Sequence, residues 1–150
     1  MRLAMRELGL IPDLVLVSSA RRTLQTLEAL APWDDVPLIE PMDALYLAPA
    51  SALLDALREV QETVRSVLLI GHNPGMHELA MILAGAQAFT QSGLSGGEGG
   101  SQAATLGRLA EGFPTCGLAE FSIAGPWGQL GEGGGRLMRF LHPTDLPEPV

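Results

Sequence analysis

Two segments of the sequence share one pattern: an apolar run of four residues, then a polar turn, then an amphipathic stretch. The first, residues 14–26, reads Leu-Val-Leu-Val-Ser-Ser-Ala-Arg-Arg-Thr-Leu-Gln-Thr, and the second, residues 67–76, reads Val-Leu-Leu-Ile-Gly-His-Asn-Pro-Gly-Met. A continuous apolar run bounded by turn residues is typical of a strand buried on both faces, as in parallel sheets. The pattern therefore predicts an α/β fold that binds ligands at the carboxyl ends of its strands.

The rest of the chain supplies the other elements of such a fold. Apolar residues recur at helical spacing in three segments, residues 20–31, 49–64 and 75–84. Residues 1–8 are typical of the end of a helix, with Gly9 as its cap. Three further strands are expected at residues 36–39, 117–123 and 136–141, and the last two pair as a hairpin. We expect an α/β three-layer sandwich, with a mostly parallel sheet and an antiparallel hairpin at its edge.

A glycine-rich tract interrupts this pattern at residues 87–107. Its core, Ser92-Gly-Leu-Ser-Gly-Gly-Glu-Gly-Gly-Ser101, offers too little apolar surface to order itself. We interpret the tract as a flexible insertion within a single domain of residues 1–150, in preference to an inter-domain linker.

Composition narrows the possible partners. The chain of 150 residues has a net charge of −8, whereas nucleic-acid binders carry basic surfaces, so we expect no nucleic-acid partner. No apolar stretch approaches the roughly 20 residues that span a membrane, so we expect no membrane partner. The single cysteine, Cys116, allows no internal disulfide, which favours the cytoplasm. No His, Cys and Asp cluster has the spacing of metal ligands, and we expect no metal or other cofactor.

The first unit carries a candidate anion site. Ser18 or Ser19 could cap the helix that follows, and Arg21 and Arg22 fall in its first turn. A cation at a helix N-terminus is unfavourable unless an anion joins it, and arginine grips phosphate oxygens with a planar fork. The alternative is a solvated helix start with surface arginines, which this segment alone leaves equally open.

The second unit places a histidine at a strand tip. His72 follows the apolar run, and Pro74 begins the next helix, so the imidazole has little freedom and can donate hydrogen bonds to a phosphoryl group. The alternative is a structural histidine that bonds a loop carbonyl. Taken together, the two units predict a phosphate site at the ends of both strands, with the arginines of the first unit and His72 of the second close together.

These residues resemble the histidine phosphatase superfamily, which has the phosphoglycerate-mutase-like fold. Ser18, Arg22, Gln25 and Thr26 match its Ser-x-x-x-Arg-Ala-x-Gln-Thr stretch, with Thr23 in place of the alanine. The order of that stretch and Gly-His-Asn-Pro-Gly is similar to the small SixA-type phosphohistidine phosphatases. The resemblance implies a phosphate site made of Ser18, Arg22, His72 and Asn73, with Arg22 and His72 as its catalytic members. Three further segments look like that branch: Asp43-Ala-Leu-Tyr46, Phe113-Pro-Thr115 and Leu141-His-Pro-Thr-Asp-Leu146.

The resemblance implies a residue that this sequence does not contain. Members of the superfamily begin with a strand that ends in Arg-His-Gly or Arg-His-Ala, whose histidine accepts the phosphoryl group. No Arg-His pair occurs in the 150 residues, and neither His77 nor His142 follows an arginine. We therefore expect an N-terminally truncated domain that lacks its first strand and its nucleophile and is inactive as given.

Three functions follow as expectations from this resemblance. The leading one is a phosphatase that acts, in its full-length form, on phosphohistidine or a related phosphoryl group through a phosphohistidine intermediate. Its partner is a phosphorylated protein or a small phosphorylated substrate. The alternatives are a non-catalytic phosphoryl-binding remnant and a small-molecule phosphatase or mutase of the same fold. Glu40 and Asp43 stand where many members place a general acid, although solvated loop carboxylates are the simpler interpretation.

Overall fold

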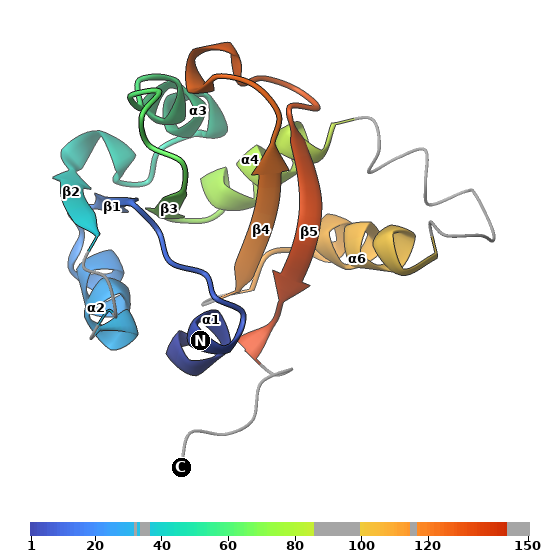
Figure 1. Ribbon diagram of the computed structural model, residues 1–150, viewed down its shortest axis with the longest axis horizontal. Helices are drawn as coiled ribbons and strands as arrows, with labels where there is room; N and C mark the ends of the chain where they lie inside the picture. The colour runs from blue at the N-terminus through green and yellow to red at the C-terminus, as the bar shows by residue number, and fades with distance from the viewer. Residues whose placement is uncertain (32, 34–36, 86–99, 115–116, 144–150) are drawn as a thin grey trace.

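The computed structural model describes residues 1–31, 33, 37–85, 100–114 and 117–143 (Figure 1). Strands and helices alternate from the N-terminus, and a hairpin closes the chain. In order, the elements are α1 (Arg2–Glu7), β1 (Leu14–Ser18), α2 (Arg21–Leu30), β2 (Leu38–Met42), the 3₁₀ turn η1 (Asp43–Leu45), α3 (Ala50–Arg58), β3 (Val67–Ile70), α4 (Gly75–Ala84), α6 (Gly100–Glu111), β4 (Leu118–Ile123), the 3₁₀ turn η3 (Trp127–Gln129) and β5 (Gly135–Leu141).

The strands form two sheets. The first is parallel in the order β2–β1–β3, and Val15 of β1 lies opposite Ile39 of β2 and Leu68 of β3. The second is the antiparallel pair of β4 and β5. The predicted α/β class, parallel sheet and hairpin are confirmed, and the hairpin is a sheet of its own.

Helices cover both faces of the parallel sheet because alternate residues of β1 point to opposite sides. Leu14 and Leu16 belong to the core formed with α3 and α4, whereas Val15 and Val17 pack with α1 and α2. In Figure 1, α1 and α2 lie below the three strands and α3 lies above them. The described part of the chain therefore has the three layers that the sequence predicts.

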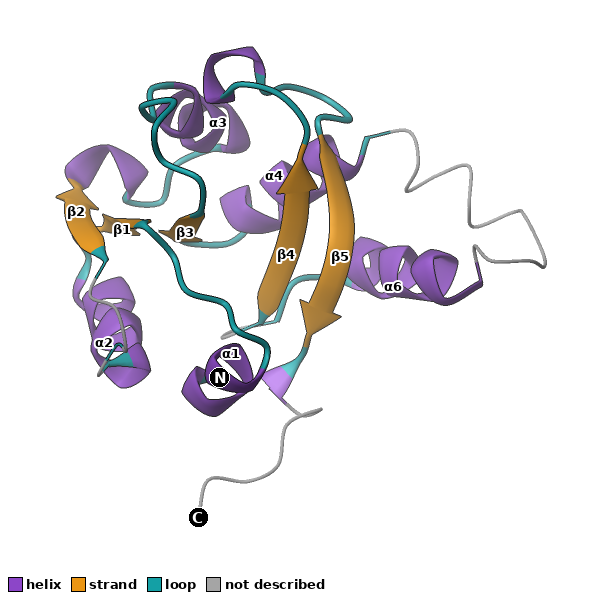
Figure 2. Ribbon diagram, viewed as in Figure 1, coloured by secondary structure: helices purple, strands orange, loops and turns teal. Residues whose placement is uncertain are grey.

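The hairpin packs against a helix that the sequence pattern does not reveal. Leu106 and Leu109 of α6 are buried with Leu137 and Phe140 of β5, and α4 completes this cluster (Figure 2). Of the expected flexible insertion at residues 87–107, positions 100–107 fall in α6, and positions 87–99 lie outside the described residues.

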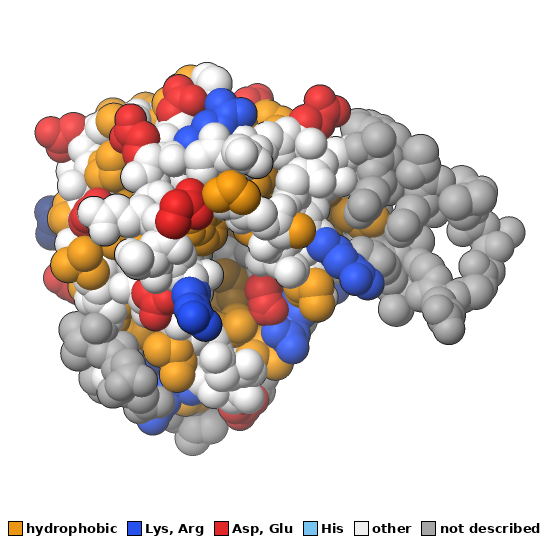
Figure 3. Space-filling model, turned by 45° about the horizontal axis from the view of Figure 1, so that its top comes forward, with side chains coloured by type: hydrophobic (Ala, Val, Ile, Leu, Met, Phe, Trp, Pro, Cys, Tyr) orange, Lys and Arg blue, Asp and Glu red, His pale blue; other side chains and the backbone are white. Residues whose placement is uncertain are grey.

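A cleft separates the two sheets. Its volume is about 690 Å³, and its walls include residues of both β3 and β4. Val67, Leu68 and Leu69 of β3 are only partly buried. Figure 1 shows β3 between β1 and the hairpin. The space-filling view shows a hollow with hydrophobic side chains inside it (Figure 3).

Strand β2 and helix α3 differ most in extent from the sequence prediction. Strand β2 begins at Leu38 and includes Pro41, which an edge strand accepts because its outer side needs no N–H donor. Helix α3 ends at Arg58, not near residue 64. The Val60 N–H bonds the Leu57 carbonyl, three residues back, so the last turn tightens while Val60 stays buried.

The loop after β2 presses against the start of α4. A Cβ atom on Gly75 would lie 2.1 Å from the carbonyl oxygen of Ala48, so only glycine fits at this position. The contact fixes the loop of residues 43–49 against the Gly-His-Asn-Pro-Gly segment.

We predict that Gly75→Ala lowers the free energy of unfolding by about 1–3 kcal/mol, because the added methyl group forces the loop and α4 apart. Urea denaturation followed by circular dichroism measures this change. The control is Gly107→Ala in α6, where an added Cβ meets no atom within 4 Å. There alanine should be neutral or stabilise by up to about 1 kcal/mol. Equal losses in both variants would contradict the predicted contact.

Candidate functional site

Ser18 and His72 meet where β1 and β3 end. The Ser18 hydroxyl oxygen lies 2.9 Å from Nε2 of His72, and the Ser18 side chain is fully buried. Because the two strands are parallel neighbours, their carboxyl ends share one edge of the sheet. The structure therefore brings these two predicted site residues into direct contact.

His72 is held from both sides. Its carbonyl accepts a hydrogen bond from the Met76 N–H at 2.9 Å, which ties the residue to the first turn of α4. Ser18 Oγ also accepts the Ala20 N–H at 3.2 Å. The hydroxyl keeps one further lone pair and its own proton, so it can accept from or donate to Nε2, according to the His72 tautomer.

Thr23 anchors this arrangement, and the sequence analysis assigned it no role. Its hydroxyl is buried and lies 2.7 Å from both the Ser18 and the Ala20 carbonyl oxygens. The end of β1 is thereby fastened to the first turn of α2. The available signal was a threonine in the first turn of a helix that begins shortly after two serines.

The N-terminus of α2 opens at this edge of the sheet. Its first helical hydrogen bond runs from the Leu24 N–H to the Ala20 carbonyl, so the N–H groups of residues 21–23 have no partner inside the helix. The N-cap residue of α2 is Ala20. The predicted cap, Ser18 or Ser19, is therefore wrong. Ser18 instead bonds the Ala20 N–H from the strand end.

Arg22 is exposed in the first turn of α2. Its carbonyl accepts the Thr26 hydroxyl at 3.0 Å. Ser18, four residues earlier, contacts His72, and Arg22 belongs to the helix that starts just after it. The expectation that the guanidinium and His72 face one phosphate stays a prediction.

Asn73 makes structural contacts. Its amide group donates to the Phe113 carbonyl at 2.7 Å, and its amide oxygen accepts the His77 N–H at 3.3 Å. His77 Nε2 lies 2.7 Å from the Leu109 carbonyl, to which it must donate because a carbonyl only accepts. These bonds join the start of α4 to the end of α6 and the residues after it. The phosphate-binding role expected for Asn73 stays a prediction.

The end of β2 lies beside Ser18. Met42 pairs with Ser18 in the sheet, and its carbonyl accepts the Ser19 N–H at 3.3 Å. Asp43 follows Met42 and is exposed near this edge, whereas Glu40 is exposed opposite Leu16, further down the strand. Three strands thus end at one edge of the sheet.

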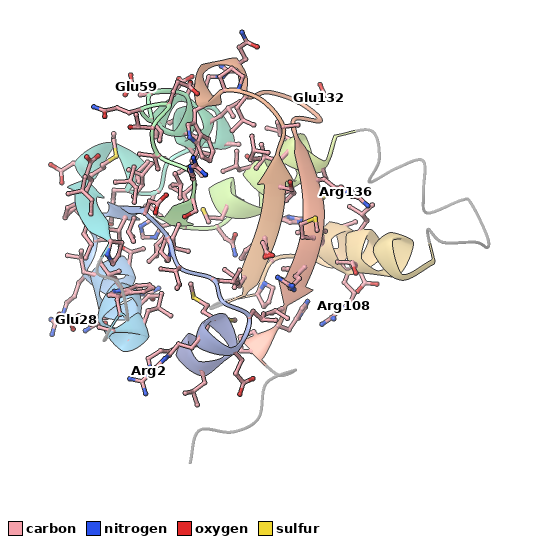
Figure 4. All side chains as sticks on the ribbon, in the orientation of Figure 1. Arg2, Glu28, Glu59, Arg108, Glu132 and Arg136 are labelled. Carbon is pink, nitrogen blue, oxygen red and sulfur yellow. The ribbon has the colours of Figure 1, made fainter. Side chains whose placement is uncertain are left out.

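The edge combines helix N–H groups that have no partner inside the helix, a hydroxyl and an imidazole, which together suit an anion with several oxygens. Among the described residues, no group of three or more His, Cys, Asp or Glu could hold a metal ion. None of the six charged side chains that Figure 4 labels belongs to a residue of this edge: Arg2, Glu28, Glu59, Arg108, Glu132 and Arg136. No helix in the described part of the chain is long and apolar enough to cross a membrane.

Comparison with known proteins gives relatives in bacteria. Two uncharacterized proteins of Mycobacterium tuberculosis, from the CDC 1551 and H37Rv strains, are each 31% identical to this chain over 131 residues. The match covers 87% of this chain and 73% of each relative. No model of a protein family matches the sequence.

Solved structures share the fold. A Nakamurella protein assigned as the phosphohistidine phosphatase SixA matches with a TM-score of 0.75 and 23% identity, over 95% of this chain and 77% of that one. The protein histidine phosphatase SixA complexed with tungstate matches with a TM-score of 0.66 and 21% identity, over 97% and 80% of the two chains. At these identities the likeness shows the fold alone.

An Agrobacterium tumefaciens protein, also assigned as SixA, is closer in sequence. It is 30% identical, with a TM-score of 0.64, and the match covers 95% of this chain and 75% of that one. Because this relative is 30% identical and the match covers most of both chains, the chain belongs to the histidine phosphatase superfamily, with the SixA phosphohistidine phosphatases as its structural neighbours.

Proposed function

We propose that this site binds the phosphoryl group of phosphohistidine on a protein, and that the enzyme built around it hydrolyses the phosphorus–nitrogen bond. The observation that carries the proposal is the 2.9 Å contact of Ser18 and His72 beside the open N-terminus of α2. Such an edge offers several hydrogen-bond donors to an oxyanion. The complex of a SixA protein with tungstate, another oxyanion, supports this choice of ligand class.

Each residue has a distinct role in the proposal. Arg22 binds two phosphoryl oxygens through its guanidinium fork, and the N–H groups of α2 add partial positive charge. His72 donates a hydrogen bond to a third oxygen, and Ser18 holds its ring in place. All of these contacts strengthen as charge builds on the phosphoryl oxygens in the transition state.

We propose that the nucleophile is none of the described site residues. His72 bonds Ser18 through Nε2, and His77 donates through Nε2 to Leu109. We propose that a histidine on a further strand accepts the phosphoryl group, and that this strand lies in the cleft between β3 and β4. A strand laid parallel to β3 there would end beside His72, at the edge where the other parallel strands end.

The proposed reaction has two displacements. A ring nitrogen of the nucleophile bonds to phosphorus while the bond from phosphorus to the substrate imidazole breaks, and that imidazole takes up a proton from solvent. Water then attacks the new phosphohistidine, which releases phosphate and restores the histidine. Imidazole, with a pKa near 6.5, leaves more easily than an alkoxide, so this substrate needs little help from Glu40 or Asp43.

We predict that Arg22→Ala raises the Kd for inorganic phosphate at least about tenfold, because charge-assisted hydrogen bonds contribute about 1.5–3 kcal/mol. Calorimetry or shifts of amide resonances with added phosphate measure the affinity. The matched control is Arg21→Ala, which removes an equal charge one residue earlier in the same exposed turn. Equal losses in the two variants would show only a general effect of charge.

We predict that the 150-residue chain releases no phosphate from a phosphohistidine peptide, because positioning without a nucleophile recovers little of the rate. A second arm uses the protein extended upstream of Met1 by the codons that precede it in the genome. This version should turn over the peptide and lose turnover with Arg22→Ala.

Two results would count against this proposal. Turnover by the 150-residue chain that depends on Arg22 would mean that one of its own residues is the nucleophile. Phosphate binding without turnover in both versions would favour a non-catalytic phosphoryl-binding protein.

A further inference from the structure

An exposed aromatic side chain stands beside the proposed phosphate site, and an exposed leucine follows it in the chain. Tyr46 and Leu47 follow the turn η1, and their exposed fractions are 58% and 63%. The ring centroid of Tyr46 lies 5.5 Å from that of His72, with the planes at 73°. Tyr46 therefore meets the imidazole edge to face while much of its ring remains open to solvent.

The loop that carries these residues is fixed on both sides of them. Leu45 before the pair is fully buried, and Ala48 after it is buried against Gly75. The Tyr46 N–H bonds the Asp43 carbonyl at 3.1 Å, and the Ala48 N–H bonds the Leu45 carbonyl at 3.3 Å. Tyr46 and Leu47 are thus held outward by a loop whose flanking residues are part of the core.

The backbone at Leu47 is strained. Its φ angle is +47°, and it is the one described residue other than glycine with a positive φ. Leucine rarely adopts this conformation, because its Cβ crowds the following carbonyl oxygen. Because the Leu47 side chain is mostly exposed, its burial does not offset this strain. Strained backbone of this kind is often found at binding sites.

We propose that Tyr46 and Leu47 form a rim that selects substrates whose phosphoryl group is carried by a ring. Tyr46 packs on the imidazole of phosphohistidine, and Leu47 contacts the polypeptide around it. Aromatic rings favour stacked or edge-to-face contacts with one another, and the negative face of a tyrosine ring also suits an imidazolium. This inference rests on the proposed function and adds a specificity determinant to it.

The structural alternative is that Tyr46 only supports the ring of His72. The two roles differ in which ligands they affect. Support of His72 would change the affinity for every phosphoryl ligand, whereas packing on a substrate ring changes the affinity only for ligands that have one.

The test compares two ligands by calorimetry, so it needs no turnover. One is a peptide with a phosphonate-substituted triazolylalanine, a stable analogue of phosphohistidine, and the other is methylphosphonate, which has no ring. We expect Tyr46→Ala to raise the Kd of the peptide about threefold to tenfold and that of methylphosphonate less than about twofold. Tyr46→Phe should keep the wild-type affinity for both.

Leu47→Gly separates strain from binding. Glycine accepts a positive φ without steric strain, and we expect relief of this strain to offset the entropy that glycine loses on folding. This variant should therefore unfold at the same urea concentration as the wild type or at a higher one. Its affinity for the peptide should nevertheless fall, while its affinity for methylphosphonate stays the same. Met138→Ala is the control, because Met138 is similarly exposed, at 52%, but lies on β5.

The outcomes separate the two proposals. If Tyr46→Ala weakens both ligands equally, or neither, the rim is overturned while the phosphate site stands. If the wild-type chain binds neither ligand, the proposed function fails, and the rim fails with it.

Discussion

Strand β1 lies between β2 and β3, and all five of its residues are buried. Its alternate side chains face two different helical layers, so the strand cannot shift by one residue without exchanging their contacts. This register fixes which residue ends the strand. Ser18 stands there because Leu14, Val15, Leu16 and Val17 fill the two cores below it. The contact between Ser18 and His72, and the site proposed around it, follow from that packing.

Hydrogen bonds connect the ends of the strands to the helices around the site. Thr23 ties α2 to the end of β1, and the His72 carbonyl ties β3 to α4. Asn73 and His77 connect α4 to α6 and to Phe113. Donors that are held in place before a ligand arrives need little rearrangement when charge develops, which is the main physical advantage of such a site.

The sequence predicted the parts of the fold that depend on local pattern. The apolar runs 14–17 and 67–70 are strands, and their parallel pairing brings Ser18 near His72, as two matched strand–turn–helix units imply. Helix α6 was missed because Gly100 and Gly107 are poor helix formers, and its burial depends on contacts with β5. The contact of Asn73 depends on Phe113, which is distant in the sequence. The positive φ of Leu47 runs against the local preference of leucine. A single sequence gives no sign of either.

The two edges of the parallel sheet differ in chemistry. Strand β2 carries Glu40 and Pro41, a charge and a residue without an N–H, both of which discourage pairing with another chain. Strand β3 is Val-Leu-Leu-Ile, with neither charge nor proline, and it borders the cleft. An apolar strand edge that stays uncovered is a template for intermolecular β-pairing. Colloidal stability of this protein therefore depends on what occupies the cleft, and aggregation should begin at β3, whereas β2 resists it.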